Sequence, residues 1–363
     1  MSAYYTMTIV LCLLSMLIMM LVVWSGDAIS SLVRHRFIIL FGVVALAAVA
    51  EWGGVQLEGT GSSTVLVHGL IKATELSCVP MLGPLAAGIL GSGTKASKAR
   101  MRAVCLALAA NAALEFLSVP FGLTFVVDAQ SVYSHAGFYW VYELACLASM
   151  AYLVVASAKV STMYQGCDNN LLLFIMVLIL VGLGAQTLDS SVRVDWICLP
   201  MAAMLFYIYY VNIILETDSL TMLLNRRSYD STITQTDEPL ALLIFDVDNF
   251  KRINDDYGHA VGDDCLRQVG SLLRGAYAEH GRCYRIGGDE FCVVMRHDLD
   301  KVDALSSTFF NSLTDVRKDK DWMPWVSMGK CDYDPATDDI ATVIEQADRM
   351  MYRFKARYNE SLR

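Results

Sequence analysis

The stretch Gly287-Gly288-Asp289-Glu290-Phe291 joins two short apolar runs, Cys283–Ile286 and Phe291–Met295. Apolar runs on either side of a glycine pair predict a β-hairpin whose tip carries Asp289 and Glu290. Because glycine has no side chain, a phosphate group or a metal ion can approach the backbone closely at this tip. The hairpin therefore presents two carboxylates in a setting that suits nucleotide chemistry.

A further carboxylate follows the apolar run Leu240–Phe245, which is continuous and has the length of a buried strand. The run ends at Asp246-Val247-Asp248, so the strand presents Asp246 at the edge of the predicted sheet. If this strand is a neighbour of the hairpin, Asp246, Asp289 and Glu290 converge. Three carboxylates repel one another unless cations share their site, and hard oxygen ligands suit Mg²⁺ or Mn²⁺. Two such ions about 4 Å apart can polarise a phosphoryl oxygen and activate an attacking hydroxyl.

Charged residues divide the chain into two parts. Residues 1–215 contain nine Lys/Arg and ten Asp/Glu, whereas residues 216–363 contain 19 Lys/Arg and 27 Asp/Glu. This contrast predicts a transmembrane input region, residues 1–215, and a soluble domain, residues 216–363, that is long enough to bury its own core. The acidic balance of the soluble part argues against nucleic acid as a partner, since binding a phosphate backbone needs a basic surface.

Seven apolar runs in the first part are each close to the roughly 20 residues that cross a bilayer as a helix. An odd number of spans puts the two ends on opposite sides of the membrane lipid. The connections after the first, third and fifth runs contain seven Lys/Arg, and the other connections contain only Arg193. This bias predicts a multi-pass protein of the inner (cytoplasmic) membrane with its N-terminus outside and the soluble domain in the cytoplasm. The runs are Tyr4–Trp24, Phe37–Val55, Thr64–Leu90, Val104–Val127, Phe138–Val160, Leu171–Leu188 and Ile197–Leu215.

The third run carries a polar face, because His68, Lys72 and Glu75 recur at i, i+4 and i+7. A charge at mid-bilayer costs about 2.5–3.5 kcal/mol on insertion scales, so such groups normally face the bundle interior and pair there. Two interpretations follow: a polar cavity that binds an unknown small ligand or responds to protons, or an ion-pair network that only fixes helix packing. Candidate partners in other runs are Glu51, Asn111, Glu115 and Glu143.

Along most of residues 218–356 the soluble part resembles the GGDEF family of diguanylate cyclases. The hairpin is one of five segments that match the family and follow one another in its order. In the segment Asp218–Arg227, which comes first along the chain, Met222 stands where a glycine is usual. The other four segments are Asp218–Arg227, Phe245–Lys251, Asn254–Asp263 and, near the end of the chain, Ser327–Gly329 with Ala347–Lys355.

The resemblance implies a palm-like α/β domain that works as a homodimer, with one GTP held by each subunit. The 3′-hydroxyl of each GTP would attack the α-phosphate of the other, and two pyrophosphates would leave as cyclic di-GMP forms. The implied protein is a membrane-bound diguanylate cyclase regulated by its transmembrane region. The alternative is a catalytically inactive GGDEF module that binds GTP and signals by dimerisation.

The resemblance also implies a role for each matching residue. Asp246, Glu290 and the backbone carbonyl of Val247 would bind Mg²⁺ or Mn²⁺, two ions per active site. Asp289 would be a further ligand or would help to activate the 3′-hydroxyl, so that Asp246, Asp289 and Glu290 form the catalytic set.

Six further positions would bind the substrate. Two of them would read guanine, because a carboxylate can accept from both N1–H and the 2-amino group. Two lysines would steady phosphates as point charges. The six are Asn254 and Asp263 for the base, Lys251 and Lys355 for the phosphates, and Gly287 and Gly288 at the hairpin.

Several of these residues also have ordinary structural interpretations. Asp263 precedes a helical pattern and, taken alone, fits an N-cap better than a base reader. Lys355 ends an apolar helix stripe, and Asn254 fits a turn. Asp248 is expected to be a surface or locally hydrogen-bonded residue, and Phe250 a packing residue.

The chain departs from the family pattern in two further places. Ala278-Glu279-His280-Gly281 stands where many members have an Arg-x-x-Asp product-inhibition site, so feedback through that site is expected to be absent. Tyr358-Asn359-Glu360 replaces the usual Gly-Arg-Asn after Lys355, which removes an expected phosphate-binding arginine. Neither change touches the metal carboxylates.

Overall fold

The computed structural model describes residues 3–26, 29–90, 95–163, 169–188 and 194–361. Within these ranges it does not describe the side chains of residues 3, 95–101, 160–163, 169, 183–188 and 357–361, and Tyr358-Asn359-Glu360 therefore lie outside the described side chains. The chain divides into two compact units. One comprises Met1–Ser161 and Asp168–Asn212, and the other comprises Thr162–Cys167 and Ile213–Arg363.

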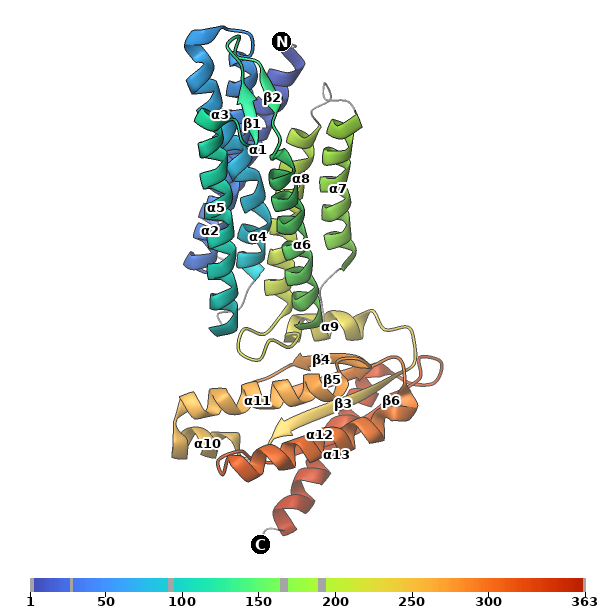
Figure 1. Ribbon diagram of the computed structural model, residues 1–363. Coiled ribbons are helices and arrows are strands. Elements are labelled where there is room, and N and C mark those ends of the chain that lie inside the picture. The colour runs from blue at the N-terminus through green and yellow to red at the C-terminus, as the bar shows by residue number, and fades with distance from the viewer. Residues whose placement is uncertain (1–2, 27–28, 91–94, 164–168, 189–193, 362–363) are drawn as a thin grey trace. The chain divides into compact units, whose positions relative to one another are not determined.

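The first unit is built from helices and one short hairpin (Figure 1). The helix that leaves this unit, α8, continues into the second unit from Ile213 onward. The elements of the first unit are α1 (Ala3–Ser25), α2 (Ser31–Leu57), the 3-10 turn η1 (Ser62–Thr64), α3 (Val65–Cys78), the 3-10 turn η2 (Val79–Met81), α4 (Leu82–Leu90), α5 (Lys95–Phe121), β1 (Phe125–Val127), β2 (Tyr133–His135), α6 (Tyr139–Met163), α7 (Asn169–Leu188) and α8 (Asp195–Glu216).

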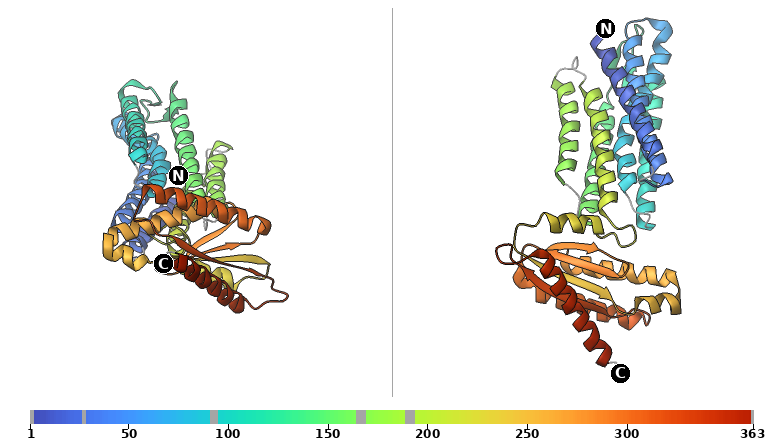
Figure 2. Two further views of the ribbon diagram at one scale, coloured as in Figure 1. Left: turned by 90° about the horizontal axis from the view of Figure 1, so that it is seen from below. Right: turned by 180° about the vertical axis from the view of Figure 1, so that it is seen from behind.

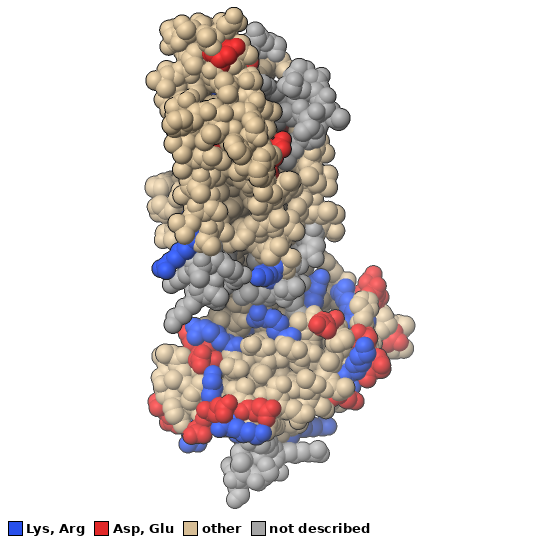
Figure 3. Space-filling model, in the orientation of Figure 1, with Lys and Arg blue, Asp and Glu red and all other residues tan. Residues whose placement is uncertain are grey.

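Six segments of the described chain are long and apolar enough to cross a membrane, so the seven predicted spans are not confirmed. The sixth predicted run, Leu171–Leu188, is helical, but its described side chains make only a shorter apolar helix, Asn170–Gly182. Figure 3 shows that the visible surface of this unit carries few charged side chains. The protein is therefore membrane-associated, and its orientation stays a prediction. The six segments are Tyr4–Ser25, Ser31–Leu57, Ser62–Leu90, Arg102–Phe121, Tyr139–Lys159 and Asp195–Glu216.

The fourth predicted run, Val104–Val127, is wrong at its C-terminal end. Helix α5 stops at Phe121, and Gly122 follows with a φ of +60°. A left-handed residue is a common helix terminator and favours glycine. Beyond it, β1 pairs with β2 as an antiparallel hairpin, so these residues do not continue the helix.

The polar face of the third run is paired within the first unit. Lys72 Nζ lies 2.8 Å from Glu75 Oε2, and the two side chains are only 10% and 14% exposed. His68 Nδ1 lies 3.1 Å from the backbone oxygen of Ser131, next to β2. The ammonium of Lys72 also lies 4.9 Å from the centre of the Tyr133 ring. Lys72 thus takes its carboxylate partner from its own helix.

The other candidate partners of the polar face lie elsewhere in the unit. Glu51 on α2 accepts a hydrogen bond from the indole of Trp196 at the start of α8. Glu115 on α5 accepts one from the hydroxyl of Thr124, with 2.6 Å between the oxygens. Both carboxylates are almost completely buried, at 2% and 0% exposure. These contacts favour the packing interpretation for this part of the bundle.

The second unit is an α/β domain, as predicted. Its four strands form an antiparallel sheet in the order β4-β5-β3-β6. The predicted strand Leu240–Phe245 lies beside the predicted hairpin, so both expectations are confirmed. The elements are α9 (Arg226–Thr234), β3 (Leu240–Val247), α10 (Phe250–Tyr257), α11 (His259–Tyr277), β4 (Gly281–Arg285), β5 (Glu290–Met295), the 3-10 turn η3 (Leu299–Lys301), α12 (Val302–Asp319), β6 (Val326–Tyr333) and α13 (Ile340–Ser361).

The central strand β3 is buried on both faces because helices cover the sheet from both sides (Figure 2). Leu243, Phe245 and Val247 belong to the core cluster that contains residues of α11 and α12. Leu242 and Ile244 point the opposite way, into the cluster that contains residues of α9 and α13. Burial of β3 on both faces explains why its residues form a continuous apolar run. Asp246 is the one carboxylate within this strand, and it lies near the strand's C-terminal end.

The C-terminal end of α8 is capped by the domain that follows it. The side-chain amide of Asn225 donates to the carbonyl of Leu215 at 2.8 Å, and its backbone N–H donates to Glu216 at 2.8 Å. The hydroxyl of Ser228 donates to the same Glu216 carbonyl at 2.9 Å. The last carbonyls of a helix have no partner inside it, so these donors complete the helix. They also fasten α8 to the first turn of α9.

Candidate active site

The strand register brings the predicted carboxylates together. Asp246 on β3 lies directly opposite Glu290 on β5. Opposite residues of an antiparallel pair point to the same face, with Cβ atoms about 4.5–5.5 Å apart. The backbone N–H of Val247 donates to the carbonyl of Asp289 at 3.1 Å, which holds the hairpin tip against the end of β3. A Cβ at Gly287 would lie 2.5 Å from Glu290 Oε2, so a larger residue would displace this carboxylate from its present position.

A lysine from the last helix completes this group. Lys355 on α13 places Nζ 2.5 Å from Asp246 Oδ1 and 3.9 Å from Asp248 Oδ1. Asp248 is 2% exposed and accepts hydrogen bonds from the Ser327 hydroxyl at 2.8 and 3.0 Å. The expectation that Asp248 is a surface or locally bonded residue is therefore wrong. Asp248 joins the end of β3 to β6, a contact between residues 79 positions apart that no local pattern indicates.

The electrostatics of the group favour a bound cation. Burial, followed by the negative charge of Asp246, raises the pKa of Asp289 and of Glu290 above their ordinary values. Burial alone would lower the pKa of Lys355, but the hydrogen bond and charge of Asp246 outweigh it and the pKa is raised. One ammonium thus faces several carboxylates that destabilise one another when ionised.

The donor set fits Mg²⁺ or Mn²⁺ held jointly by protein and substrate. Carboxylates and a strand-end carbonyl are hard oxygen ligands. Among the side chains that the structure describes, no three His, Cys, Asp or Glu residues form a complete metal site by themselves. Magnesium usually takes only one or two protein carboxylates and completes its shell with waters and phosphates. Asp246 and Glu290 supply two such carboxylates on one face.

Of the two predicted base-reading residues, Asn254 packs against Gly262, the residue that precedes Asp263. A Cβ on Gly262 would lie 2.0 Å from the Asn254 side-chain oxygen, so glycine allows the Asn254 amide to lie across the first turns of α11. Asp263 is the next residue, and its side chain is 52% exposed with a distant contact to Arg267. Helix α11 begins at His259 with Gly258 as its N-cap, so the N-cap interpretation of Asp263 is wrong.

The remaining predicted substrate residues are more scattered. Lys251 lies exposed in the first turn of α10, and no contact to the carboxylate group is found for it among the described residues. Gly288 is exposed at the hairpin tip, where its carbonyl accepts from Arg285 Nη2 at 2.7 Å. Arg285 also pairs with Asp218, which makes both residues part of the site's support. Sequence reasoning missed this pair, because 67 positions separate the two residues.

Residues 215–361 match the family model described as "Diguanylate cyclase, GGDEF domain". The C-terminal domain belongs to the GGDEF family. The resemblance drawn from the sequence is thus confirmed.

The similarity to two named relatives extends over 146 and 185 residues, which is 38% and 48% of this chain. The diguanylate cyclase DgcS of Shewanella oneidensis is 29% identical over 146 residues, which is 38% of this chain and 49% of the relative. The diguanylate cyclase DgcP of Escherichia coli is 31% identical over 185 residues, or 48% and 52% of the two chains. The chain thus spans about half the length of these relatives. The crystal structure of the GGDEF domain of DgcB from Caulobacter crescentus with c-di-GMP is 27% identical, covering 39% of this chain and 90% of that chain with a TM-score of 0.34.

Proposed function

We propose that this protein is a membrane-bound diguanylate cyclase that converts two GTP into cyclic di-GMP and two pyrophosphates. The observation that carries the proposal is the pairing of Asp246 with Glu290 across β3 and β5, with Lys355 reaching the same group from α13. The names of the GGDEF relatives DgcS and DgcP support it.

In this proposal Asp246, Glu290 and the carbonyl of Val247 hold two Mg²⁺ or Mn²⁺ ions together with the triphosphate. When bound, the ions polarise the α-phosphate and lower the pKa of the attacking hydroxyl. Asp289 is a further ligand or accepts the proton of the 3′-hydroxyl. Lys355, whose Nζ lies 2.5 Å from Asp246 Oδ1, would neutralise charge on the phosphates.

The remaining residues bind and orient GTP. Asn254 and Asp263 hydrogen-bond the guanine edge, and Lys251 with Gly287 and Gly288 accommodates the phosphates. Each 3′-oxygen forms a bond to the α-phosphorus of the other GTP, and the bond from that phosphorus to the β-phosphate oxygen breaks. Because each GTP is both nucleophile and electrophile, the reaction requires a homodimer of GGDEF domains.

Regulation would enter through α8. Its last carbonyls are fixed by Asn225 and Ser228, so a displacement of this helix end reaches α9 without a flexible linker. The input would be a small ligand or a proton at the transmembrane unit. The domain would lie in the cytoplasm, with the N-terminus on the outer side of the inner membrane.

The test is turnover by the full chain in detergent with GTP and Mg²⁺. One cyclic di-GMP and two pyrophosphates should form for every two GTP consumed. Asp289→Ala and Glu290→Ala should abolish product while circular dichroism stays unchanged. Asp332→Ala, an exposed carboxylate opposite Ala241 at the other end of β3, is the matched control and should retain activity. GTP binding by the wild type without any product would instead support the inactive, dimerising module.

A further inference from the structure

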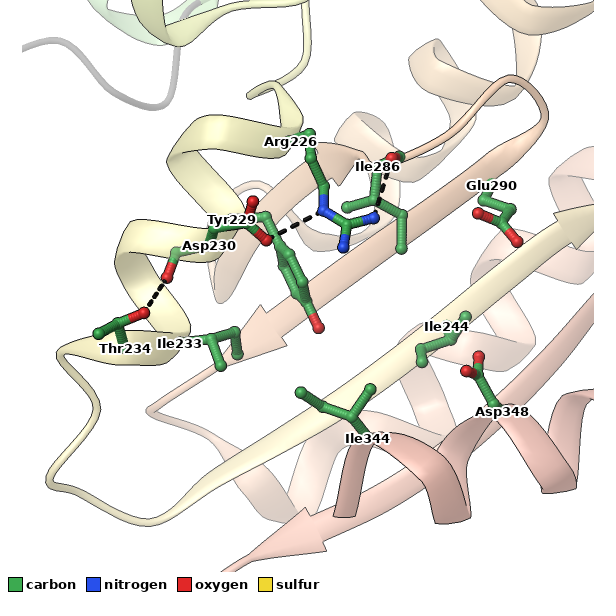
Figure 4. Close-up of a pocket in the computed structure, with 10 residues that line it drawn as sticks. All are labelled: Arg226, Tyr229, Asp230, Ile233, Thr234, Ile244, Ile286, Glu290, Ile344 and Asp348. Carbon is green, nitrogen blue, oxygen red and sulfur yellow. Dashed lines mark hydrogen bonds and ion pairs between the residues drawn. The ribbon is translucent and has the colours of Figure 1, made fainter. Parts of the chain in front are cut away.

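A groove of about 400 Å³ lies between α9, the sheet and α13 (Figure 4). Its floor is apolar and includes Tyr229, Ile244 and Ile344. Tyr229 and Ile244 are 5% and 3% exposed and belong to one buried core cluster on this face of the sheet. The groove has room for a ligand with one or two aromatic rings, and burying such a ring contributes about 25 cal/mol for each Å² of apolar surface.

The rim of the groove has an unbalanced negative charge. Arg226 pairs with Asp230 at 2.9 Å and its charge also acts on Glu290, so one arginine at the rim faces three carboxylates. At the opposite end, Glu290 projects from β5 and Asp348 from α13 (Figure 4). Neither of these two carboxylates has an ion-pair partner among the side chains that the structure describes.

We propose that this groove binds a small aromatic cation, such as an arylamidine or a protonated arylalkylamine. Its ring lies on the floor formed by Tyr229, Ile244 and Ile344, and its positive group lies between Asp348 and Glu290. The apolar floor stabilises the ring by burial, and the two carboxylates select a cation over a neutral or anionic compound of the same shape.

The groove is separate from the predicted GTP-binding residues, apart from one shared carboxylate. Asn254, Asp263 and Lys251 do not line it, whereas Glu290 does. It also touches α9, whose first turn is fastened to the end of α8 through Asn225. A bound cation would therefore contact both the helix that receives α8 and the catalytic hairpin, which gives the domain an effector site on the face of α9 and α13.

The probe is p-aminobenzamidine, whose fluorescence rises in an apolar site, titrated against the full chain in detergent with EDTA. Saturable binding is expected for the wild type, and the neutral analogue p-aminobenzamide should show none. Asp348→Asn should weaken the Kd about fivefold, the upper range for an exposed ion pair. Glu345→Gln removes an exposed carboxylate of the same helix that does not line the groove, and it should leave the Kd unchanged.

The variant Asp263→Asn shows whether the probe binds in the groove or at the predicted guanine site, because it removes the carboxylate predicted to read guanine. Unchanged binding by this variant supports the groove. The proposal is overturned if the probe does not saturate, if Asp348→Asn binds like the wild type, or if Asp263→Asn abolishes binding. The readout is fluorescence without GTP, so an inactive cyclase would not affect the result.

Discussion

Arg285 and Asp218 form an ion pair, with 3.1 Å between Nη1 and Oδ1, that connects the entry of the GGDEF domain to the hairpin of β4 and β5. The two side chains are only 15% and 22% exposed. The same guanidinium donates to the carbonyl of Gly288 at the hairpin tip. Asp218 stands two positions after the last residue of α8, so one side chain links the end of this helix to the hairpin tip.

Replacement of Arg285 tests this link. Arg285→Met should lower cyclase turnover about tenfold, because the hairpin loses a donor that holds Gly288 and a misplaced catalytic group costs rate steeply. The measurement is the rate of cyclic di-GMP formation at saturating GTP. Arg282→Met, on the exposed side of the same strand, is the control. Equal rates for Arg285→Met and the wild type would show that the pair does not position the hairpin.

The pKa of Asp218 predicts acid sensitivity. Burial raises this pKa, but hydrogen bonds from Thr221 and Arg285 outweigh burial, so the pKa lies below its ordinary value. A depressed folded-state pKa stabilises the fold above the unfolded pKa, and the contribution is lost as pH falls through the folded value. Asp218→Asn should cost about 2 kcal/mol of unfolding free energy at pH 7 and much less near pH 2. Urea unfolding of residues 213–363 at both pH values measures the difference, and a constant difference contradicts the assignment.

Lys355 should be required for turnover and not for folding. It is the cation nearest Asp246, and in the proposed mechanism it meets the phosphates. Lys355→Met should reduce kcat/KM for GTP about 100-fold, in the range reported for removal of one charge-stabilising donor. Lys330→Met is the control, because Lys330 pairs with the exposed Asp303 away from the site. Similar losses in both variants would assign Lys355 a merely structural role.

Met222 is strained, and its replacement by glycine should stabilise the domain. Its φ is +61°, in the left-handed region that side chains disfavour. Met222→Gly removes this strain but adds flexibility to the unfolded chain, so the net gain should be about 0.5–1 kcal/mol. Met222→Ala keeps the strain and serves as the control. Thermal unfolding gives the answer, and a lower Tm for the glycine variant would contradict it.

The buried pair Lys72–Glu75 should behave as a unit. Lys72→Met alone leaves a buried carboxylate without its cation, which costs about 3–5 kcal/mol. The double variant Lys72→Met with Glu75→Gln should recover most of this loss, because neither charge is then left unpaired. Thermal stability of the purified chain in detergent measures both effects. Normal stability of Lys72→Met with altered cyclase output would point instead to a ligand-binding role.

Local sequence was enough for the features that depend on neighbours along the chain. The alternation of apolar runs and turns predicted β3 and the hairpin, because strand burial and glycine turns are properties of short segments, and the resemblance to the GGDEF family implied the α/β domain. The same reasoning overestimated the membrane part. Hydropathy counts apolar residues, and it cannot tell that Gly122 ends α5 or that residues 125–127 form a strand.

By itself the sequence determined which residue types are available for chemistry, where β3 and the hairpin lie, and which part of the chain is apolar enough for a membrane. Only the tertiary structure decided which of those residues meet. Lys355 contacts Asp246 across 109 positions because α13 packs on the sheet, and Asp248 contacts Ser327 across 79 because β6 pairs with β3. Such contacts follow from strand register and helix packing, and these depend on the whole buried core rather than on any segment of it.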